Sequence, residues 1–294
     1  MNLQLSARPP FSLTSVVQSH GWAQLAPFDL DPDSGELSYV YHLGTGWIVD
    51  LHFNEISNGV NVDLSDKINV GDKTEINQAV NWMFGLDQEF SDFYRLAQKE
   101  PKLKHVVDKA QGRILRSPSL FEDVIKTILT TNTTWAGTIR MTEALVTQFG
   151  DPLPGETARY AFPTPEAIAA SDEQTLRDTT RLGYRSPYIL NLAQEIAAGS
   201  LDLESLKSSD TPADQLRKEL LSIKGVGNYA AANLLMLLGH YEYLTIDSWA
   251  LKMVSHEWYD DTQIGPEEVE TAFEDWGKWR GLAYWLWDWS YVSD

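Results

Sequence analysis

The spacing of hydrophobic and polar positions changes near residue 76. Before it, residues 36–43 (ELSYVYHL) and 46–53 (GWIVDLHF) carry partial alternation together with β-branched and aromatic residues, which is typical of strands. Asn58-Gly59 lies between two extended runs and is a strong hairpin-turn signal. These features predict an antiparallel β-sheet in the first third of the chain, and we assign residues 1–99 to a β-sheet-rich N-terminal domain.

From about Ile76 the apolar residues recur near the helical period, and residues 77–98 are expected to form a helix. The next helix is better delimited, because Ser119 and Glu122 form a Ser-x-x-Glu capping box before a single apolar stripe. Further helical patterns follow to the end of the chain. Residues 100–294 are therefore expected to be mainly α-helical, which gives an α+β protein.

Two helical patterns joined by a tight turn occupy about residues 212–239. The turn is Lys224-Gly225-Val226-Gly227, and the second helix starts at Asn228. Glycine permits positive φ and close approach of a phosphate, and the N–H groups that open the second helix favour an anion. Such a helix-hairpin-helix contacts the DNA backbone rather than base edges. A purely structural glycine turn is the alternative.

One acid follows the hairpin at the end of an apolar run. Asp247 lies twenty residues after Gly227 and precedes Ser248-Trp249, where the next helix is expected to begin. For a lone Asp at a helix start the ordinary role is that of an N-cap. Its distance from the hairpin suggests a second role, which rests on a resemblance.

The segment Leu220–Val254 resembles the HhH-GPD superfamily of base-excision DNA glycosylases, in which a hairpin of the form L-x-x-I-x-G-V-G-x-x-A-A precedes the catalytic aspartate. Residues 112–116 (GRILR), 130–133 (TTNT) and 182–185 (LGYR) are similar to the 8-oxoguanine DNA glycosylase branch. Residues 279–284 (WRGLAY) are more similar to bacterial 3-methyladenine DNA glycosylase II. The resemblance implies an N-terminal antiparallel β-sheet domain followed by a helical HhH-GPD domain pair, with a C-terminal helix packing back on the core.

The resemblance also implies the chemistry. Asp247 would be the carboxylate that stabilises positive charge on the sugar while the N-glycosidic bond breaks. Bifunctional relatives place a lysine two positions after the second hairpin glycine, as the amine for a Schiff base, and here that position is Tyr229. We therefore expect a monofunctional enzyme without AP-lyase activity. Lys224, like the turn residues 225–227, is expected to contact phosphate.

An aromatic pocket is expected for the flipped-out base, since alkylated bases are cations that stack on π faces. The candidates are Tyr229, Trp249, Tyr284, Trp285 and Trp287. Core packing is the alternative for each. Asp288 lies four residues after Tyr284 and is expected on the same helix face, which by family alignment points into the pocket. The alternative for Asp288 is a solvated acid in an acidic tail.

Two more residues are expected at the DNA. Asn132 lies where the 8-oxoguanine branch has an Asn that contacts the base left unpaired after flipping, and Arg185 ends the LGYR segment. The resemblance further implies a monovalent cation held at the hairpin by backbone carbonyls. No other cofactor is expected.

Composition excludes several other classes of protein. The chain of 294 residues has no Cys, so disulfides, thiolate nucleophiles and iron–sulfur clusters are excluded. The six His residues show no metal-ligand spacing, and no metal is expected. No apolar run approaches the ~20 residues of a membrane span, and the first residues lack a signal-peptide pattern. We expect a cytoplasmic, nucleoid-associated protein if the source is prokaryotic, and a monomer.

The formal net charge of −19 argues against broad electrostatic capture of DNA. The charge is uneven: residues 1–100 carry −9, residues 257–294 carry −8, and the middle carries only −2, with its bases clustered between Lys102 and Arg116. A backbone-to-phosphate contact at the hairpin needs little positive charge, so double-stranded DNA with a damaged base stays the expected partner.

The leading hypothesis is a monofunctional DNA glycosylase of base excision repair that removes an alkylated purine. One alternative is a glycosylase for oxidised or deaminated purines such as 8-oxoguanine or hypoxanthine. Another is a non-catalytic lesion-binding protein, which the net charge and Asp288 favour and the presence of Asp247 argues against.

Overall fold

The structure, a computed structural model, describes residues 1–64, 68–208 and 210–289. The chain groups into two compact units, each assembled from more than one segment. Unit 1 contains residues 1–88, 113–209 and 223–225, and unit 2 contains residues 89–112, 210–222 and 226–294. The units therefore do not follow a division at residue 99, because the helices of residues 113–208 group with the sheet.

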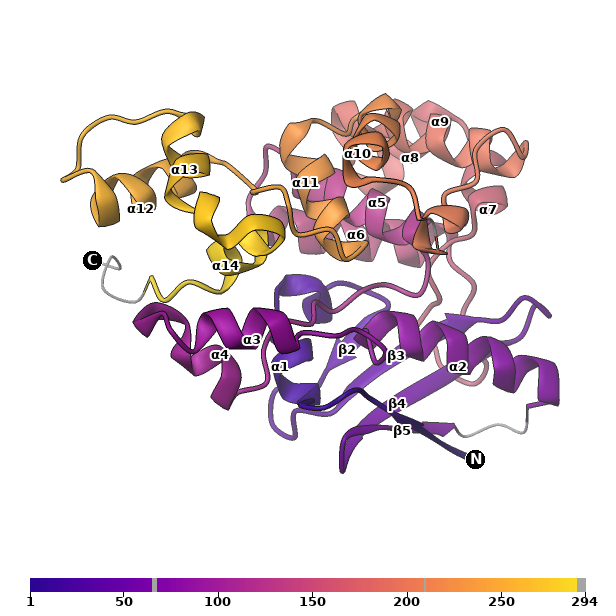
Figure 1. Cartoon of the computed structure of the whole chain (residues 1–294). Helices are drawn as coiled ribbons and strands as arrows, with labels where there is room; N and C mark the ends of the chain where they lie inside the picture. The colour runs from indigo at the N-terminus through magenta and orange to yellow at the C-terminus, as the bar shows by residue number, and fades with distance from the viewer. Residues whose placement is uncertain (65–67, 209, 290–294) are drawn as a thin grey trace. The chain divides into compact units, whose positions relative to one another are not determined.

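Unit 1 opens with a five-stranded antiparallel sheet in the order β1-β5-β4-β3-β2 (Figure 1). The strands are β1 (Asn2–Ser6), β2 (Phe28–Leu30), β3 (Leu37–His42), β4 (Ile48–Ile56) and β5 (Gly59–Leu64). Asn58 adopts φ +55°, and the turn at Asn58-Gly59 joins β4 to β5, with Ile56 opposite Gly59. The N-terminal antiparallel sheet and its hairpin are thus confirmed.

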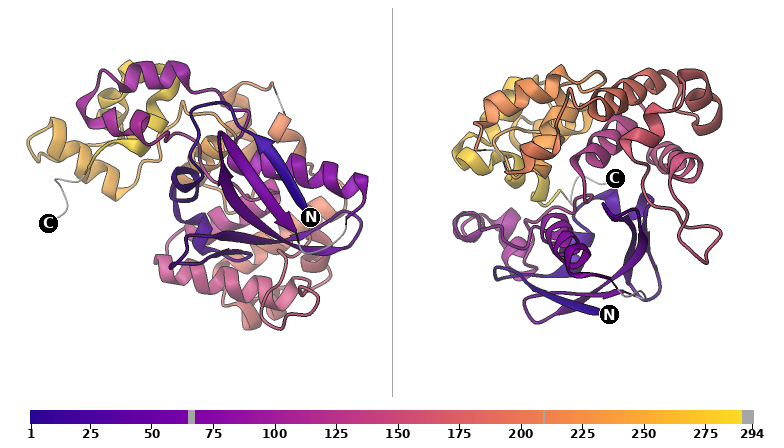
Figure 2. Two further views of the ribbon diagram at one scale, coloured as in Figure 1. Left: turned by 90° about the horizontal axis from the view of Figure 1, so that it is seen from below. Right: turned by 90° about the vertical axis from the view of Figure 1, so that its right-hand side faces the viewer.

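Each face of the sheet makes apolar contacts within unit 1. Helix α2 (Val70–Phe84) lies against one face, where the rings of Phe53 and Phe84 meet edge to face at 4.9 Å (Figures 1 and 2). On the other side, Val40 packs with Leu153 and Ala161 in a small apolar cluster. Because apolar positions are needed on both faces, the strands show only partial alternation.

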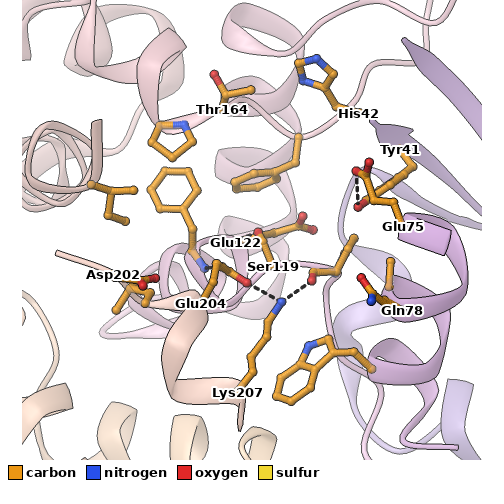
Figure 3. Close-up of a pocket in the computed structure, with 18 of the residues that line it drawn as sticks. Tyr41, His42, Glu75, Gln78, Ser119, Glu122, Thr164, Asp202, Glu204 and Lys207 are labelled. Carbon is orange, nitrogen blue, oxygen red and sulfur yellow. Dashed lines mark hydrogen bonds and ion pairs between the residues drawn. The ribbon is translucent and has the colours of Figure 1, made fainter. Parts of the chain in front are cut away.

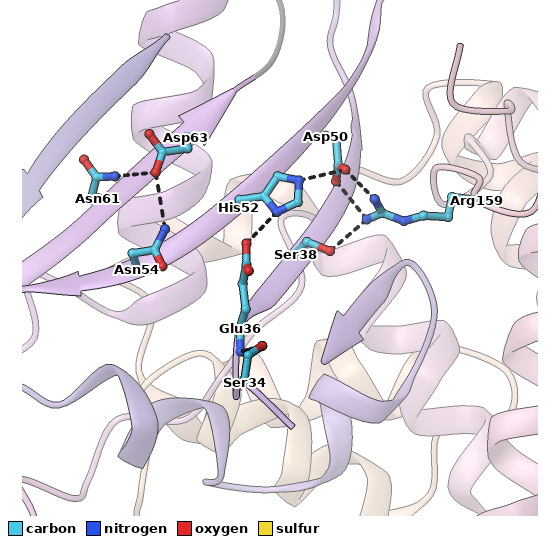
Figure 4. A network of polar contacts seen from close by, with 9 residues as sticks. All are labelled: Ser34, Glu36, Ser38, Asp50, His52, Asn54, Asn61, Asp63 and Arg159. Atoms are coloured by element: carbon cyan, nitrogen blue, oxygen red, sulfur yellow. Dashed lines mark hydrogen bonds and ion pairs between the residues drawn. The ribbon is translucent and has the colours of Figure 1, made fainter. Parts of the chain in front are cut away.

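The loop of residues 151–162 is fastened to the sheet by a polar network (Figure 4). The Arg159 guanidinium donates to both carboxylate oxygens of Asp50 and, at 2.8 Å, to Ser38 Oγ. The ring nitrogens of His52 lie 3.0 Å from Asp50 Oδ2 and 2.8 Å from Glu36 Oε1. A single carboxylate, that of Asp50, therefore joins the loop cation to a histidine on its own strand.

The expected helix over residues 77–98 is wrong in both its start and its length. The helix α2 begins earlier, after Asn69, whose side chain forms a capping box with Asp72. It ends at Gly85, which adopts φ +57°, the left-handed conformation that commonly stops a helix. Residues Ser91–Ala97 then form a separate short helix, α3.

Unit 1 contains further helices besides α2. They are α1 (Leu13–Val17), η1 (Gly21–Gln24), α5 (Leu120–Thr130), α6 (Trp135–Phe149), α7 (Pro165–Ala169), α8 (Glu173–Thr180), η3 (Gly183–Arg185), α9 (Ser186–Ala197) and η4 (Glu204–Ser208). Ser119 caps α5 by accepting from the Glu122 N–H at 3.2 Å. The Glu122 side chain does not complete the expected capping box, because it pairs with Lys126 at 2.6 Å and accepts from Tyr39 OH at 2.6 Å.

Unit 2 is helical. It contains α3, η2 (Pro101–Leu103), α4 (Lys104–Asp108), α10 (Ala213–Ser222), α11 (Asn228–Leu237), α12 (Ser248–Trp258), α13 (Pro266–Ala272), η5 (Glu274–Trp279) and α14 (Arg280–Leu286). An aromatic cluster holds its first segment to its last: Trp279 lies 5.5 Å from Phe93 and stacks on Tyr241 at 5.5 Å. Within the described residues, no helix is long and apolar enough to cross a membrane.

Candidate active site and DNA-binding hairpin

The glycine turn joins α10 to α11 as the sequence predicts, but its two glycines differ. Gly225 adopts φ +93°, and a Cβ there would lie 2.8 Å from the Tyr188 ring. Gly227 is the N-cap of α11 with φ −94°, and a Cβ there would meet nothing within 4 Å. Backbone geometry therefore requires glycine at residue 225 alone, while Gly227 leaves open space beside the helix start.

The N-terminus of α11 has the features of a phosphate-binding helix end. No side chain caps it, since Gly227 has none to offer, and Gly227 and Asn228 are exposed. The unpaired N–H groups of a helix's first turn and its dipole favour an anion. Lys224 is also exposed, just before the turn.

Asp247 is the N-cap of α12, which is the ordinary role expected for an Asp at a helix start. Its Oδ1 accepts from the Ala250 N–H at 2.8 Å. Within the described residues this is the only hydrogen bond of that carboxylate, and the side chain is exposed. Capping fixes the orientation of the carboxylate and leaves Oδ2 for another partner.

The Asp247 carboxylate opens onto a pocket of about 300 Å³ in unit 2. The pocket is lined by Tyr229, Thr245, Asp247, Trp249, Tyr284 and Trp285. Four of the five expected aromatic residues are thus brought together with the expected carboxylate. Thr245 was missed by sequence reasoning, although its place two residues before Asp247 in an extended segment puts both on one side of the chain.

Helix α14 reaches the pocket because it packs very close to residues 241–243. The Gly281 N–H donates to Tyr241 O at 2.8 Å, and a Cβ at Gly281 would lie 2.3 Å from Tyr243 O. Arg280 Nε donates to Glu242 O, one residue along. Only glycine allows this approach, and it places Tyr284, one turn later, beside Asp247.

Burial and the Asp247 carboxylate together raise the pKa values of the two tyrosines that line the pocket. Burial raises the pKa of Tyr284 far above its usual range, and the charges of Asp247 and Tyr229 raise it further. The pKa of Tyr229 is also raised, first by burial and then by Asp247. Both phenols therefore stay protonated at physiological pH, so the pocket presents neutral rings and a single carboxylate.

The aromatic rings differ in exposure. Tyr284 is buried, whereas Trp249 is 45% exposed, and their rings meet edge to face at 6.4 Å. Trp249 also meets the Trp289 ring edge to face at 5.5 Å, so two neighbouring rings hold this partly exposed side chain at the pocket.

Two expected pocket residues lie elsewhere. Trp287 is buried against Trp258 and Phe273, at 5.2 and 5.3 Å, so it packs in the core. The inference that Asp288 shares a helix face with Tyr284 is wrong, because α14 ends at Leu286 and Trp287 is extended. Asp288 is exposed, does not line the pocket, and donates its N–H to Lys102 O at 3.2 Å.

Unit 1 holds the other expected DNA contacts. Asn132 is exposed with φ +49°, and its Nδ2 donates to Tyr184 OH at 3.3 Å. Arg185 is buried, and its guanidinium donates to the carbonyls of Thr131 and Asn132. The expected direct contact of Arg185 with DNA is therefore corrected: the arginine holds the Asn132 turn in place.

Among the residues that the structure describes, no lysine lines the pocket, and Lys252 of α12 is exposed. Across residues 1–64, 68–208 and 210–289, no group of three or more His, Asp or Glu side chains is arranged to hold a metal ion. The monovalent cation that the resemblance implies at the hairpin stays a prediction.

The sequence of the chain also matches a known protein family. Residues 125–278 match the HhH-GPD superfamily of base excision DNA repair proteins. The chain belongs to this superfamily, and the match includes the hairpin and Asp247.

Individual curated proteins are also similar to this chain in sequence. The chain is 30% identical over 166 residues to DNA-3-methyladenine glycosylase of Bacillus subtilis, covering 56% of this chain and 54% of that protein. It is 25% identical over 194 residues to DNA-3-methyladenine glycosylase 2 of Escherichia coli, covering 60% and 63%. The matched region thus spans about half of the first relative's length.

Solved structures share the fold. The 3-methyladenine DNA glycosylase of Archaeoglobus fulgidus superposes with a TM-score of 0.78 at 20% identity, covering 99% of both chains. The 8-oxoguanine glycosylase/lyase of Clostridium acetobutylicum superposes with a TM-score of 0.72 at 20% identity, covering 95% of this chain and 92% of the other. The sheet-bearing α+β architecture is therefore common to both kinds of structure.

Proposed function

We propose that this protein is a monofunctional DNA glycosylase that removes an alkylated purine from double-stranded DNA. The observation that carries the proposal is the pocket of unit 2, where the Asp247 carboxylate faces Tyr229, Trp249 and Tyr284. The names of the B. subtilis and E. coli relatives support the same substrate class.

Asp247 supplies the charge that the reaction needs. Breaking the N-glycosidic bond builds positive charge on the sugar, and a fixed carboxylate stabilises it without reorganisation. The cap on Ala250 N holds Oδ1 at the helix start, which leaves Oδ2 to face the sugar or to orient the attacking water. The positively charged leaving base of an N-alkylated purine departs readily, so little general-acid help is required.

The pocket walls favour a cationic base. Neutral aromatic rings attract a cation through their π faces, and the partly exposed Trp249 offers such a face. The raised pKa values of Tyr229 and Tyr284 keep these rings neutral, so the single negative group is the one beside the sugar.

The absence of lysine from the pocket lining supports hydrolysis without strand cleavage. A Schiff base needs an amine within reach of the sugar C1′. Tyr229 occupies the position of that amine and has no nucleophilic nitrogen.

DNA is held, in this proposal, by backbone contacts at the start of α11. The open space beside Gly227 admits a phosphate to the helix N-terminus. Asn132, exposed on a turn that Arg185 buttresses, would contact the base left unpaired.

The proposal is tested by incubating the protein with duplexes that contain N7-methylguanine, 3-methyladenine, 8-oxoguanine, hypoxanthine or uracil. Alkali added afterwards reveals abasic sites, and borohydride present during the reaction traps any Schiff base. We expect release of the methylated purines, strands intact before alkali, and no trapped complex. Release of 8-oxoguanine alone, or a borohydride adduct, would contradict the proposal, and binding without release would indicate a lesion-binding protein.

A further inference from the structure

Unit 1 contains a cavity that the proposed glycosylase reaction does not use. Its volume is about 1100 Å³, and it lies between α2, the start of α5, the loop before α7, and η4 (Figure 3). Aromatic rings form much of its wall: Tyr39, Tyr41, Trp82, Phe121 and Phe162. A cavity of this size with aromatic walls is typical of sites that bind small organic molecules.

The cavity is acidic. Its lining includes the carboxylates of Glu75, Glu122, Asp202 and Glu204, against one ammonium group, that of Lys207. Two of these acids are neutralised locally. Glu122 pairs with the buried Lys126 at 2.6 Å, and Glu204 forms an ion pair with Lys207, whose Nζ also donates to Pro118 O at 2.6 Å.

The other two acids have no cationic partner among the described residues. Glu75 accepts from Tyr41 OH at 3.1 Å and from the Gly44 N–H at 2.9 Å, both neutral donors. Asp202 accepts from the Ser205 N–H at 3.2 Å, again a neutral donor. Hydrogen bonds of this kind fix the orientation of a carboxylate and leave its charge uncompensated.

The two carboxylates lie on opposite sides of the cavity. Glu75 projects from α2 beside Tyr41, and Asp202 lies across the cavity on the segment before η4 (Figure 3). The cavity lies between them and is lined by the aromatic wall together with polar residues such as Ser119 and Glu204. The pKa of Tyr41 is raised first by burial and then by the charge of Glu75, with smaller contributions from Glu204 and Glu122.

We propose that this cavity binds an extended organic dication, a small molecule with two cationic groups separated by an apolar body. One cationic group would pair with Glu75 and the other with Asp202, and the apolar body would lie against the aromatic wall. The Tyr41 ring, whose hydroxyl donates to Glu75, adds cation–π attraction at that end of the ligand. The same chemistry occurs in free aliphatic polyamines and in two basic side chains of a peptide, and the proposal takes the free amine as the ligand.

The proposal is tested by isothermal titration of the full-length protein at low salt with putrescine (1,4-diaminobutane), which has two cationic groups, and with butylamine as a ligand of one charge. We expect saturable binding of putrescine at one site and at least tenfold weaker binding of butylamine. A tetrapeptide, Lys-Leu-Leu-Lys with both ends blocked, tests the alternative that the cavity binds two basic side chains of a peptide. Binding of the peptide without binding of putrescine would overturn the proposal in favour of a protein partner.

Three amide variants complete the test. Glu75→Gln and Asp202→Asn each keep the oxygen that accepts the native hydrogen bond, so the fold is retained while the charge is removed. Each should weaken putrescine binding by about tenfold or more, the usual effect of one lost charge-assisted hydrogen bond. Glu270→Gln, an exposed acid of α13, is the matched control for net charge and should bind normally. Equal loss in all three variants, or no saturable binding to the wild type, would refute the site.

Discussion

Asp247 combines two tasks that substitutions can separate. Asparagine caps a helix as well as aspartate does, so Asp247→Asn should change the free energy of unfolding by less than about 0.5 kcal/mol. It removes the charge beside the sugar, and the single-turnover rate of base release should fall by ~10²–10³. Thermal unfolding and DNA affinity measured on the same preparation provide the control. A near-wild-type rate would show that Asp247 takes no part in the reaction.

Asp288 is expected to have no influence on the choice of base. Its side chain is exposed and does not line the pocket. Asp288→Asn should therefore leave the ratio of kcat/KM for a cationic base to that for a neutral base unchanged within about twofold. Tyr284→Leu, which removes a pocket ring, serves as the contrasting variant and should lower this ratio. A lowered ratio in Asp288→Asn would restore the pocket role expected from sequence.

The sequence predicted the positions of site residues correctly where a motif determines the backbone. The prediction failed where it depended on extending a helix beyond its actual end. The motif placed Asp247, Tyr229 and Trp249 at the pocket. Asp288 was assigned by counting four residues along a helix that ends at Leu286. The burial of Arg185 depends on carbonyls of residues 131–132, which are distant in sequence and leave no local signal.

At the scale of elements, the two hairpin glycines should respond differently to substitution. Gly225→Ala places a Cβ at φ +93° and against Tyr188, and should cost about 1–3 kcal/mol of unfolding free energy. Gly227→Ala has an allowed backbone and open space, so its stability loss should be smaller, at most the ~1 kcal/mol of a weaker N-cap.

DNA affinity distinguishes the same two variants. The methyl group of Gly227→Ala lies where a phosphate would approach α11, so binding to damaged and undamaged duplexes should weaken by the same factor. Fluorescence anisotropy with both duplexes measures this. Loss confined to damaged DNA would mean that the hairpin contributes to base selection, contrary to a backbone contact.

The network on the outer face of the sheet should make stability depend on pH. Burial lowers the pKa of His52, but its hydrogen bonds to Glu36 and Asp50 outweigh that effect and the pKa is raised. A raised pKa means that the protonated ring stabilises the fold below the unfolded-state pKa of about 6.5, and that this contribution is lost as pH rises through the folded-state pKa.

The measurement is the thermal unfolding midpoint from about pH 5.5 to pH 8.5 for the wild type and His52→Gln. The wild type should exceed the variant by more at the acid end than at the alkaline end. Since His52 is partly exposed, added salt should reduce this difference. Parallel curves for the two proteins would show that the imidazolium contributes nothing.

Elements with a strong local signal were predictable, and those shaped by distant contacts were not. The strands around Asn58-Gly59 and the hairpin of α10 and α11 carry turn residues that specify them locally. The division between α2 and α3 depends on Gly85, whose left-handed conformation the apolar periodicity of residues 77–98 conceals. Helix α5 is buried on its charged side as well, because Tyr39 OH donates a hydrogen bond to Glu122 and Trp22 Nε1 donates one to Asp123.

At the scale of the whole molecule, the charge of −19 limits how DNA can be held. If phosphates are met mainly by backbone N–H groups, few condensed counterions are displaced by side chains. The logarithm of the binding constant should then fall only gently with the logarithm of salt concentration. A slope equivalent to ~6–10 phosphate contacts would show that basic side chains dominate instead.

The discontinuous make-up of unit 2 has a consequence for its biosynthesis. Residues 89–112 belong to this unit but are translated before residues 113–209, which belong to the other. At ~5–20 residues per second, translation from Phe93 to Trp276 takes on the order of 10–40 s, and Phe93 waits that long for its ring partners Trp276 and Trp279. Throughout that interval the nascent chain presents an unsatisfied apolar segment, the kind of sequence that chaperones retain. Synonymous codons that slow translation of residues 113–209 should therefore lower the soluble yield without altering a single amino acid.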